Sequence, residues 1–348
     1  MPMSFAWSTA ELGVLCPGDD PVCLYYGDTS PDRVSLEPYT TIIALHGTGF
    51  NSEIWNPWLQ HIPTDVRLIA FNRRGFAGSS PVHQSTEVLP SNPEAYGRYV
   101  LDLLAFIKFV VEVLRVPSKS ENGSGGIALL GWSKGCAFLT TLLTSLSTDD
   151  ELPTSLSLPR KTIDPYLAIT RSHVKSLVMF EPPGWTVGIP LRGPLFDESL
   201  PLADMASTFI SGCLQTFPPQ YIETVKLSID DMWSTGHDLQ CWNGATLEER
   251  EESATKGFDN IPPSIGVAVI YCAGTVIETC IAGAEWMINH CAGRPNTTSR
   301  VIPGGNHFVM ATDPERFDDA VMSSIRELAA SARHSTASAE HLFLSSHL

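Results

Sequence analysis

The segment around Ser133 constrains the fold more than any other part of the chain. Residues 131–135 read Gly-Trp-Ser-Lys-Gly, a G-x-S-x-G pattern. An apolar run at 127–130 precedes it and predicts a buried strand, and a run at 136–143 follows it and predicts a helix. A strand that turns sharply into a helix at such a motif exposes the serine hydroxyl, and glycines flank the serine because the turn leaves no room for side chains. We therefore expect a strand–turn–helix unit that presents Ser133 as a candidate nucleophile.

Strand and helix patterns alternate through most of the chain, which predicts a parallel sheet covered by helices. Strands are expected at 12–15, 22–26, 41–45, 66–71, 127–130, 174–180, 265–272 and 299–303, and helices at 93–114, 136–143, 278–291 and 314–333. Residues 145–172 are rich in Ser, Thr, Pro and Asp and are expected to form a long surface excursion. Between 185 and 263 the alternation stops and short helical pieces alternate with Pro and Gly, which predicts an inserted helical cap. The expected organisation is a core formed by 1–184 and 264–333, a cap formed by 185–263, and a flexible tail at 334–348.

Composition narrows the classes of partner. The formal net charge of the 348-residue chain is −16, from 22 Lys and Arg against 38 Asp and Glu, which argues against nucleic acid and against an anionic membrane surface. No apolar run is long enough to span a bilayer, and the first residues lack the basic and apolar regions of a secretory signal. None of the eight cysteines forms a C-x-x-C pair, so no zinc ribbon is expected and the thiols are expected to be reduced. With no metal site and no nucleotide-binding loop visible, no cofactor is expected.

The chain ends in Ser346-His347-Leu348, which is similar to the S-K-L address of peroxisomal proteins. A frayed tail is the equally simple interpretation of these residues. The expected location is therefore intracellular, in the cytoplasm or, through an import receptor that binds this tripeptide, in the peroxisome.

A serine nucleophile needs a base within hydrogen-bond reach and a third group that orients the base. His307 follows the last predicted strand across a Gly304-Gly305 loop and is the candidate base. Two carboxylates compete for the third role. Glu181 stands at the tip of the 174–180 strand, before two prolines that stiffen the backbone, and Glu278 follows the next strand. We favour Glu181 and keep Glu278 as the alternative.

Backbone N–H groups are expected to stabilise the negative oxygen that forms when a serine attacks a carbonyl. Lys134, the residue after the nucleophile, supplies one donor. Gly47 or Thr48, in the loop that follows the 41–45 strand, supplies the other. His46 in the same loop is expected to be structural.

From about residue 12 to residue 333 the chain resembles the α/β-hydrolase superfamily. The resemblance rests on four segments in their expected order, namely His46-Gly47, Arg74-Gly75-Phe76-x-Gly78-Ser79, Gly131 to Gly135, and Gly305-Asn306-His307-Phe308. It implies an α/β-hydrolase fold, with a mostly parallel eight-stranded sheet flanked by helices and an inserted helical cap. The acid after the sixth strand, the Gly-x-His-Phe loop and the cap before the seventh strand are similar to the fungal zearalenone-lactonase type of hydrolase. The chain departs from that type at Trp132, at Lys134 and in residues 145–172.

The first functional hypothesis is a serine hydrolase that cleaves an ester or lactone of an apolar small molecule, such as a fungal secondary metabolite. Trp132 and Trp185 flank the candidate catalytic residues and are expected to line the substrate pocket. The alternative keeps the fold without hydrolysis of an ester, as a cyclase, a carbon–carbon bond lyase or hydrolase, or a small-molecule binder. A purely partner-binding protein ranks last. Capped hydrolases of this size are often monomers or dimers, so a homodimer is also considered.

Overall fold

The structure of the chain is a computed structural model, and it describes residues 3–33, 38–82, 94–120, 123–190, 200–215, 217, 219–229, 238, 244–275 and 277–345. Within these ranges, the side chains of residues 202, 203, 224, 278 and 334–345 are not described. The predicted tripeptide Ser346, His347 and Leu348 and the side chain of Glu278 therefore lie outside the described residues.

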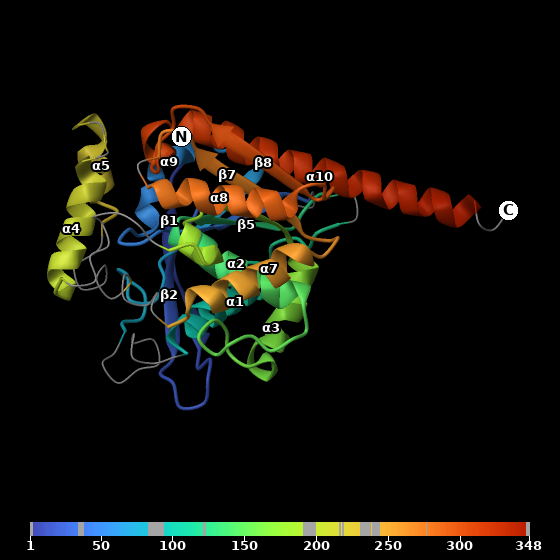
Figure 1. The fold of residues 1–348 in the computed structure, drawn as a ribbon, viewed down its shortest axis with the longest axis horizontal. Helices are drawn as coiled ribbons and strands as arrows, with labels where there is room; N and C mark the ends of the chain where they lie inside the picture. Colours follow the sequence, from blue (N-terminus) through green and yellow to red (C-terminus); the bar gives the residue numbers. More distant parts are fainter. Residues whose placement is uncertain are drawn as a thin grey trace.

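An eight-stranded, mostly parallel sheet forms the centre of the molecule (Figure 1). Its spatial order is β1-β2-β4-β3-β5-β6-β7-β8; β2 is antiparallel to β1 and to β4, and the remaining neighbours are parallel. The strands are β1 (Ala6–Gly13), β2 (Val22–Asp28), β3 (Thr40–Leu45), β4 (Val66–Phe71), β5 (Ile127–Trp132), β6 (Val174–Phe180), β7 (Gly266–Cys272) and β8 (Thr297–Ile302). The predicted fold class is confirmed.

The central strands are apolar because helices cover both of their faces. Every residue of β4 and β5 is buried, as are nearly all of β3, β6 and β7. The first strand is different. It was predicted at 12–15, which is wrong, because β1 is an edge strand on which Ala10 is the one buried residue and therefore has a weak apolar signal.

Two layers of helices pack around the sheet (Figure 1). In one layer, α1 contacts α2, α2 contacts α7, and α7 contacts α8; in the other, η1, α9 and α10 contact one another. The helices are η1 (Ser52–Gln60), α1 (Ala95–Glu112), α2 (Lys134–Ser147), α3 (Arg160–His173), η2 (Gly184–Val187), α4 (Leu202–Gln215), η3 (Pro219–Tyr221), α5 (Ile222–Lys226), α7 (Leu247–Asp259), α8 (Glu278–Cys291), α9 (Val309–Thr312) and α10 (Pro314–Ser345). None of the helices in the described chain combines the length and the apolar character that a membrane span requires.

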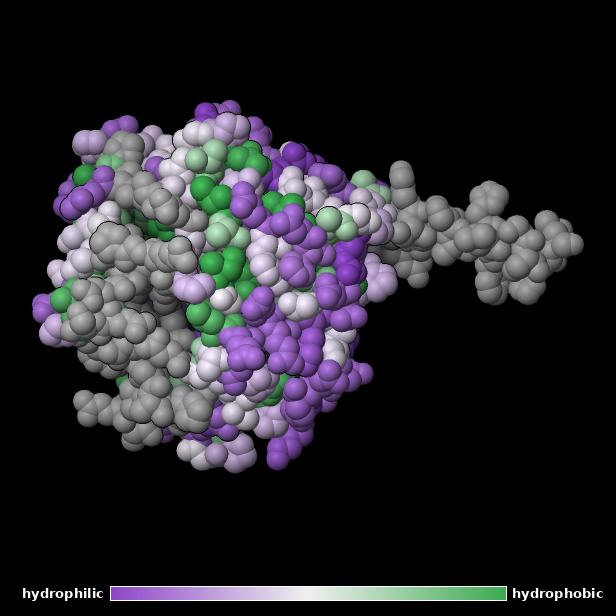
Figure 2. Space-filling model, in the orientation of Figure 1, coloured by the Kyte–Doolittle hydropathy of each residue, from purple (hydrophilic) through white to green (hydrophobic). Residues whose placement is uncertain are grey.

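The segment 145–172 is more regular than predicted. Helix α3 forms its second half and packs against α1, with Ile163, Leu167 and Thr170 buried. These three positions follow helical spacing, but the surrounding residues are polar and Pro165 interrupts the pattern, so the sequence signal was weak. Hydrophilic residues cover the region of α3 on the face shown in Figure 2.

The insertion between β6 and β7 contains helices with two kinds of position. Helices α4 and α5 lie to one side of the sheet (Figure 1), and α4 buries Met205, Phe209 and Cys213 along one face. Helix α7 instead packs on α2 of the sheet layer, where the Thr144 hydroxyl donates a hydrogen bond to the carbonyl of Ser253 at 2.9 Å. The C-terminal part of the insertion therefore extends the helical layer over the sheet.

Candidate active site

Ser133 occupies the turn between β5 and α2. Its backbone has φ 53° and ψ −120°, a conformation that is strained for a residue with a side chain. The flanking glycines are required by space. A Cβ atom on Gly131 would lie 2.7 Å from the carbonyl carbon of Gly135, and one on Gly135 would lie 2.7 Å from the carbonyl oxygen of Leu45. The turn therefore has the geometry that its sequence predicts.

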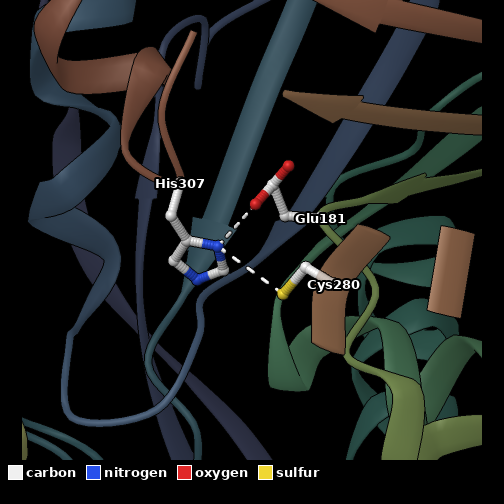
Figure 3. Close-up of side chains that lie close together, drawn as sticks. All are labelled: Glu181, Cys280 and His307. Atoms are coloured by element: carbon white, nitrogen blue, oxygen red, sulfur yellow. Dashed lines mark hydrogen bonds and ion pairs between the residues drawn. The ribbon is translucent and has the colours of Figure 1, made fainter. Parts of the chain in front are cut away.

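Glu181 follows β6 and also has a positive φ, of 53°. Its carboxylate is fully buried and makes two contacts, of which Figure 3 shows the one with His307. Oε2 lies 2.8 Å from Nδ1 of His307, and Oε1 accepts a hydrogen bond from the backbone N–H of Cys272 at 2.6 Å. Both carboxylate oxygens are thus fixed, one by the imidazole and one by the end of β7.

His307 lies between β8 and α9, and its side chain is buried. The indole of Trp132 donates a hydrogen bond to the carbonyl oxygen of His307 at 2.9 Å, which holds the loop beside the nucleophile turn. An ionised carboxylate only accepts hydrogen bonds, so in the neutral ring the proton is on Nδ1 and Nε2 is the basic nitrogen. Nε2 lies on the side of the ring away from Glu181 (Figure 3). Within the described residues no hydrogen bond joins Ser133 to His307, and catalytic bonds of this kind often tighten only with substrate bound.

The loop after β3 lies directly against the nucleophile. A Cβ atom on Gly47 would lie 3.1 Å from Cβ of Ser133 and 3.0 Å from the indole of Trp132, so a side chain there would require these neighbours to move. Thr48 is buried, and its hydroxyl oxygen has no hydrogen-bond partner among the described residues. On the other side of the turn, Lys134 is the first residue of α2, where the helix dipole is positive. Gly47 and Lys134 therefore lie on either side of Ser133, and Thr48 follows Gly47 in the same loop.

His46 in this loop is fully buried and makes hydrogen bonds within the core. Its Nε2 accepts the backbone N–H of Arg73 at 3.1 Å, and its Nδ1 lies 3.0 Å from the carbonyl oxygen of Gly47. Burial lowers the pKa of His46 well below its usual value, and the Arg73 cation lowers it further. A neutral imidazole thus connects the β3 loop to the end of β4.

Two buried residues near the site were not predicted from the sequence. Cys280 in α8 places its Sγ 3.8 Å from Nδ1 of His307, and Asp238 forms ion pairs with Arg73 and Lys134. Cysteine is common in protein cores, so Cys280 gave no distinctive signal. Asp238 is 104 and 165 residues from its partners, a separation at which no local pattern indicates pairing.

Glu181, Cys280 and His307 have ligand atoms within 4.8 Å of one another, a spacing compatible with a metal ion. Their chemistry fits a different role. Burial raises the pKa of the Cys280 thiol well above its usual value, and the Glu181 carboxylate raises it further, whereas a metal requires the thiolate. Glu181 already uses both oxygens. The arrangement matches a carboxylate that orients an imidazole.

The two predicted pocket tryptophans are both buried. Trp132 packs between the rings of Phe50 and Phe308, and Trp185 in η2 lies under the guanidinium of Arg250, which is 4.8 Å from its ring centre. The backbone of Glu278, the alternative acid, begins α8.

A cavity of about 480 Å³ lies at the other end of the parallel strands. It is lined by Lys175 near the start of β6, by Gly266 at the start of β7 and by Leu328 of α10. None of the predicted site residues lines this cavity.

Comparisons with known proteins agree with this architecture. The sequence model of the alpha/beta hydrolase family matches residues 42–320. A thermophilic esterase from Thermogutta terrifontis superposes with a TM-score of 0.57 at 14% identity, over 92% of this chain and 99% of that one. The peroxisomal alpha-beta-hydrolase Lpx1 from Saccharomyces cerevisiae superposes with a TM-score of 0.58 at 11% identity, over 96% of this chain and 90% of that one. A putative aryl esterase from Burkholderia cenocepacia superposes with a TM-score of 0.55 at 17% identity, over 89% of this chain and 96% of that one. No curated protein matches the chain in sequence. At these identities the likeness shows the fold.

Proposed function

Because the chain belongs to the alpha/beta hydrolase family, we propose that it is a serine hydrolase that cleaves an ester or lactone of an apolar small molecule. One observation supports this more than any other. The imidazole of His307, beside the nucleophile turn, is held at 2.8 Å by a carboxylate whose second oxygen is itself hydrogen-bonded. A buried structural histidine is satisfied by any hydrogen-bond partner, whereas a general base needs a carboxylate on Nδ1, because the carboxylate selects the tautomer with a basic Nε2.

The reaction follows from these positions. The Ser133 hydroxyl attacks the carbonyl carbon while its proton moves to Nε2 of His307, and the carbonyl π electrons move to the oxygen. The tetrahedral intermediate collapses when its carbon–oxygen bond to the leaving alcohol breaks and Nε2 returns the proton to that alcohol. Water then attacks the acyl-enzyme by the same route and releases the acid and free Ser133. Glu181 remains ionised and stabilises the imidazolium in both steps.

The negative oxygen of the intermediate is bound by the backbone N–H groups of Lys134 and of Gly47 or Thr48. Gly47 lies against Ser133, and Lys134 opens the helix that follows it. The unpartnered hydroxyl of Thr48 favours an additional contact with the substrate oxygen, since a buried hydroxyl without a partner costs about 1–3 kcal/mol.

An apolar substrate is favoured by the residues of the insertion that reach the site. Phe217 packs against Phe308, the residue directly after the candidate base, with ring centres 4.3 Å apart and ring planes tilted by 43°. Trp132 and Trp185 would border the pocket on the core side. The esterases among the structural neighbours favour an ester, and the resemblance to zearalenone-lactonase-type hydrolases favours a lactone of a fungal secondary metabolite.

The cellular location belongs to the same proposal. One structural neighbour is named as peroxisomal, and the Ser346-His347-Leu348 terminus of this chain would address an import receptor; the alternative is the cytoplasm. A homodimer is the oligomeric state to test, alongside a monomer.

An activity-based probe tests the central claim. A fluorophosphonate should label the wild-type protein at Ser133, and Ser133→Ala should abolish the label. His307→Ala should slow labelling by orders of magnitude, because the serine then lacks its base. Absence of labelling, or equal labelling of wild type and His307→Ala, would contradict the proposal and favour a non-hydrolytic binder. A panel of aryl esters and macrolactones then identifies the substrate class.

A further inference from the structure

Asp238 forms a buried charge cluster with Arg73 and Lys134. Its carboxylate accepts two hydrogen bonds from the guanidinium of Arg73, at 2.6 and 2.9 Å, and one from the ammonium of Lys134 at 2.6 Å. The same ammonium also donates to the backbone carbonyl of Asp238. All three residues are at most 3% exposed. We call these three residues the Asp238 cluster.

The cluster joins three separate parts of the chain. Arg73 follows β4, Lys134 follows the nucleophile Ser133, and Asp238 belongs to the insertion between β6 and β7. Burial alone would raise the pKa of Asp238, but the two cations and their hydrogen bonds hold it well below its usual value. Asp238 is therefore ionised and the cluster has a net charge of +1. A buried cation without this carboxylate would be strongly unfavourable.

The cluster reaches both sides of the oxyanion site. Arg73 Nη2 donates to the carbonyl oxygen of Gly47 at 2.9 Å as well as to Asp238. A trans peptide holds its C=O and the next N–H in opposite directions, so this bond also fixes the direction of the Thr48 N–H. On the other side, Asp238 anchors the side chain of Lys134, whose backbone N–H is the second proposed donor.

We propose that Asp238 is a positioning residue for catalysis, which aligns the two backbone donors of the oxyanion hole through Arg73 and Lys134. The inference rests on the proposed serine hydrolase function. The insertion must then contact the core through Asp238 for the oxyanion hole to have its active geometry. The insertion makes a second contact with the loop after β3, since the Asn51 N–H donates to the carbonyl of Ser228 at 2.7 Å. The net positive charge of the Asp238 cluster also stabilises the developing oxyanion.

The chain contains a matched control. Asp28 and Arg67 form an ion pair that is just as buried, with exposures of 1% and 0% and two hydrogen bonds of 2.5 and 3.0 Å. This pair lies at the opposite end of the parallel strands, because Arg67 is paired with Thr41 near the start of β3. Asp28→Asn and Asp238→Asn therefore remove the same charge from equally buried positions, although Asp238 has two cationic partners and Asp28 has one. Only the partners of Asp238 reach the oxyanion site.

The test compares the two variants by thermal unfolding, by kcat and KM on an aryl ester, and by the rate of fluorophosphonate labelling. Both should unfold at lower temperature. Asp238→Asn alone should lower kcat and the labelling rate by about 10²–10³-fold, the loss seen when one oxyanion donor is removed, with a small change in KM. Asp28→Asn should keep kcat within a few-fold of wild type.

Three results would overturn the inference. Asp238→Asn could leave kcat at the level of Asp28→Asn, or it could raise KM alone. Should Asp238→Asn fail to fold, Arg73→Lys replaces it, because the lysine keeps a cation beside Asp238 but lacks the guanidinium fork that also reaches Gly47. The third refuting result is an unchanged kcat in Arg73→Lys. A wild-type protein that neither labels nor hydrolyses overturns the proposed function too, whereas an active wild type with an unaffected Asp238→Asn overturns the positioning role alone.

Discussion

The substitution Glu181→Gln tests the orienting carboxylate, and the structure predicts how the amide will sit. Oε1 of Glu181 accepts the N–H of Cys272 at 2.6 Å, so in the variant the amide oxygen must take this position. The amide nitrogen then faces Nδ1 of His307, where Oε2 lies now at 2.8 Å. Because an amide nitrogen is a donor, Nδ1 must become the acceptor and the proton moves to Nε2. The imidazole then has no basic nitrogen for Ser133.

The expected loss is large because the variant keeps the shape of the site and changes only the tautomer. The corresponding substitution in a Ser-His-Asp triad lowers kcat by about 10⁴-fold, which corresponds to about 5 kcal/mol of transition-state free energy. KM should change little. The assay is steady-state hydrolysis of an aryl ester, with fluorophosphonate labelling as a second readout and the unfolding temperature as the check on folding.

Glu278→Gln is the control, because Glu278 is the alternative acid. The proposal expects this variant to keep kcat within a few-fold of wild type. If Glu181→Gln folds and retains more than a tenth of the wild-type kcat, the reasoning about the tautomer is wrong. If Glu278→Gln shows the large loss instead, the acid belongs to the loop after β7.

Three further substitutions give sharp expectations. Thr48→Val should lower kcat by about 10²-fold if the hydroxyl binds the oxyanion, while the unfolding free energy stays equal or rises, because the hydroxyl has no partner to lose; equal kcat would remove Thr48 Oγ1 from the site. Trp185→Ala should change the ratio of the hydrolysis rates on short and bulky esters, with a smaller effect on the rate of fluorophosphonate labelling. An equal loss of hydrolysis and of labelling would indicate a purely structural role for Trp185. His46→Gln should flatten the pH dependence of stability. The folded-state pKa of His46 lies well below its usual 6.5, so the unfolded state binds an extra proton as the pH falls through 6.5, and the wild type loses at most about 1.6 kcal/mol between pH 6.5 and 5 through this residue. Urea unfolding at both pH values should show a smaller difference for the variant, and an unchanged difference would mean that His46 titrates normally.

Local patterns predicted most of the fold, because each central strand is a short, mostly apolar run that a polar residue or a glycine follows within two positions. The turn at Ser133 and the loop at Gly47 could be predicted from their short glycine-containing motifs. Most of the close contacts that disfavour a side chain there, such as Gly135 with Leu45 and Gly47 with Ser133, join distant parts of the chain. Strand β1 and helix α3 were harder to predict. Each buries few residues, so tertiary contacts rather than apolar periodicity determine where they form.

The Asp238 cluster could not be predicted for a different reason. Buried ion pairs form between residues that the fold brings together, and one Asp among 38 acidic residues has no local feature that identifies it. The same holds for the contact of Cys280 with His307. A sequence indicates which residues can perform the chemistry more readily than which residues hold them in position.

The position of Glu181, the proposed acid, follows from the hydrogen bonds that continue the sheet beyond its strands. Ser133 N–H donates to the carbonyl of Phe180 at 3.0 Å, and Glu181 N–H donates to the carbonyl of Ile270 at 2.8 Å. Cys272 N–H then donates to the Glu181 side chain, so hydrogen bonds connect Ser133, Glu181 and the end of β7 in one continuous series. These bonds offset the strained backbone of both functional residues, which costs about 1–3 kcal/mol each. The Glu181 carboxylate, which follows β6, therefore reaches His307 without any change in the sheet. The space next to His307 that an acid following β7 would occupy is available for the thiol of Cys280 in α8.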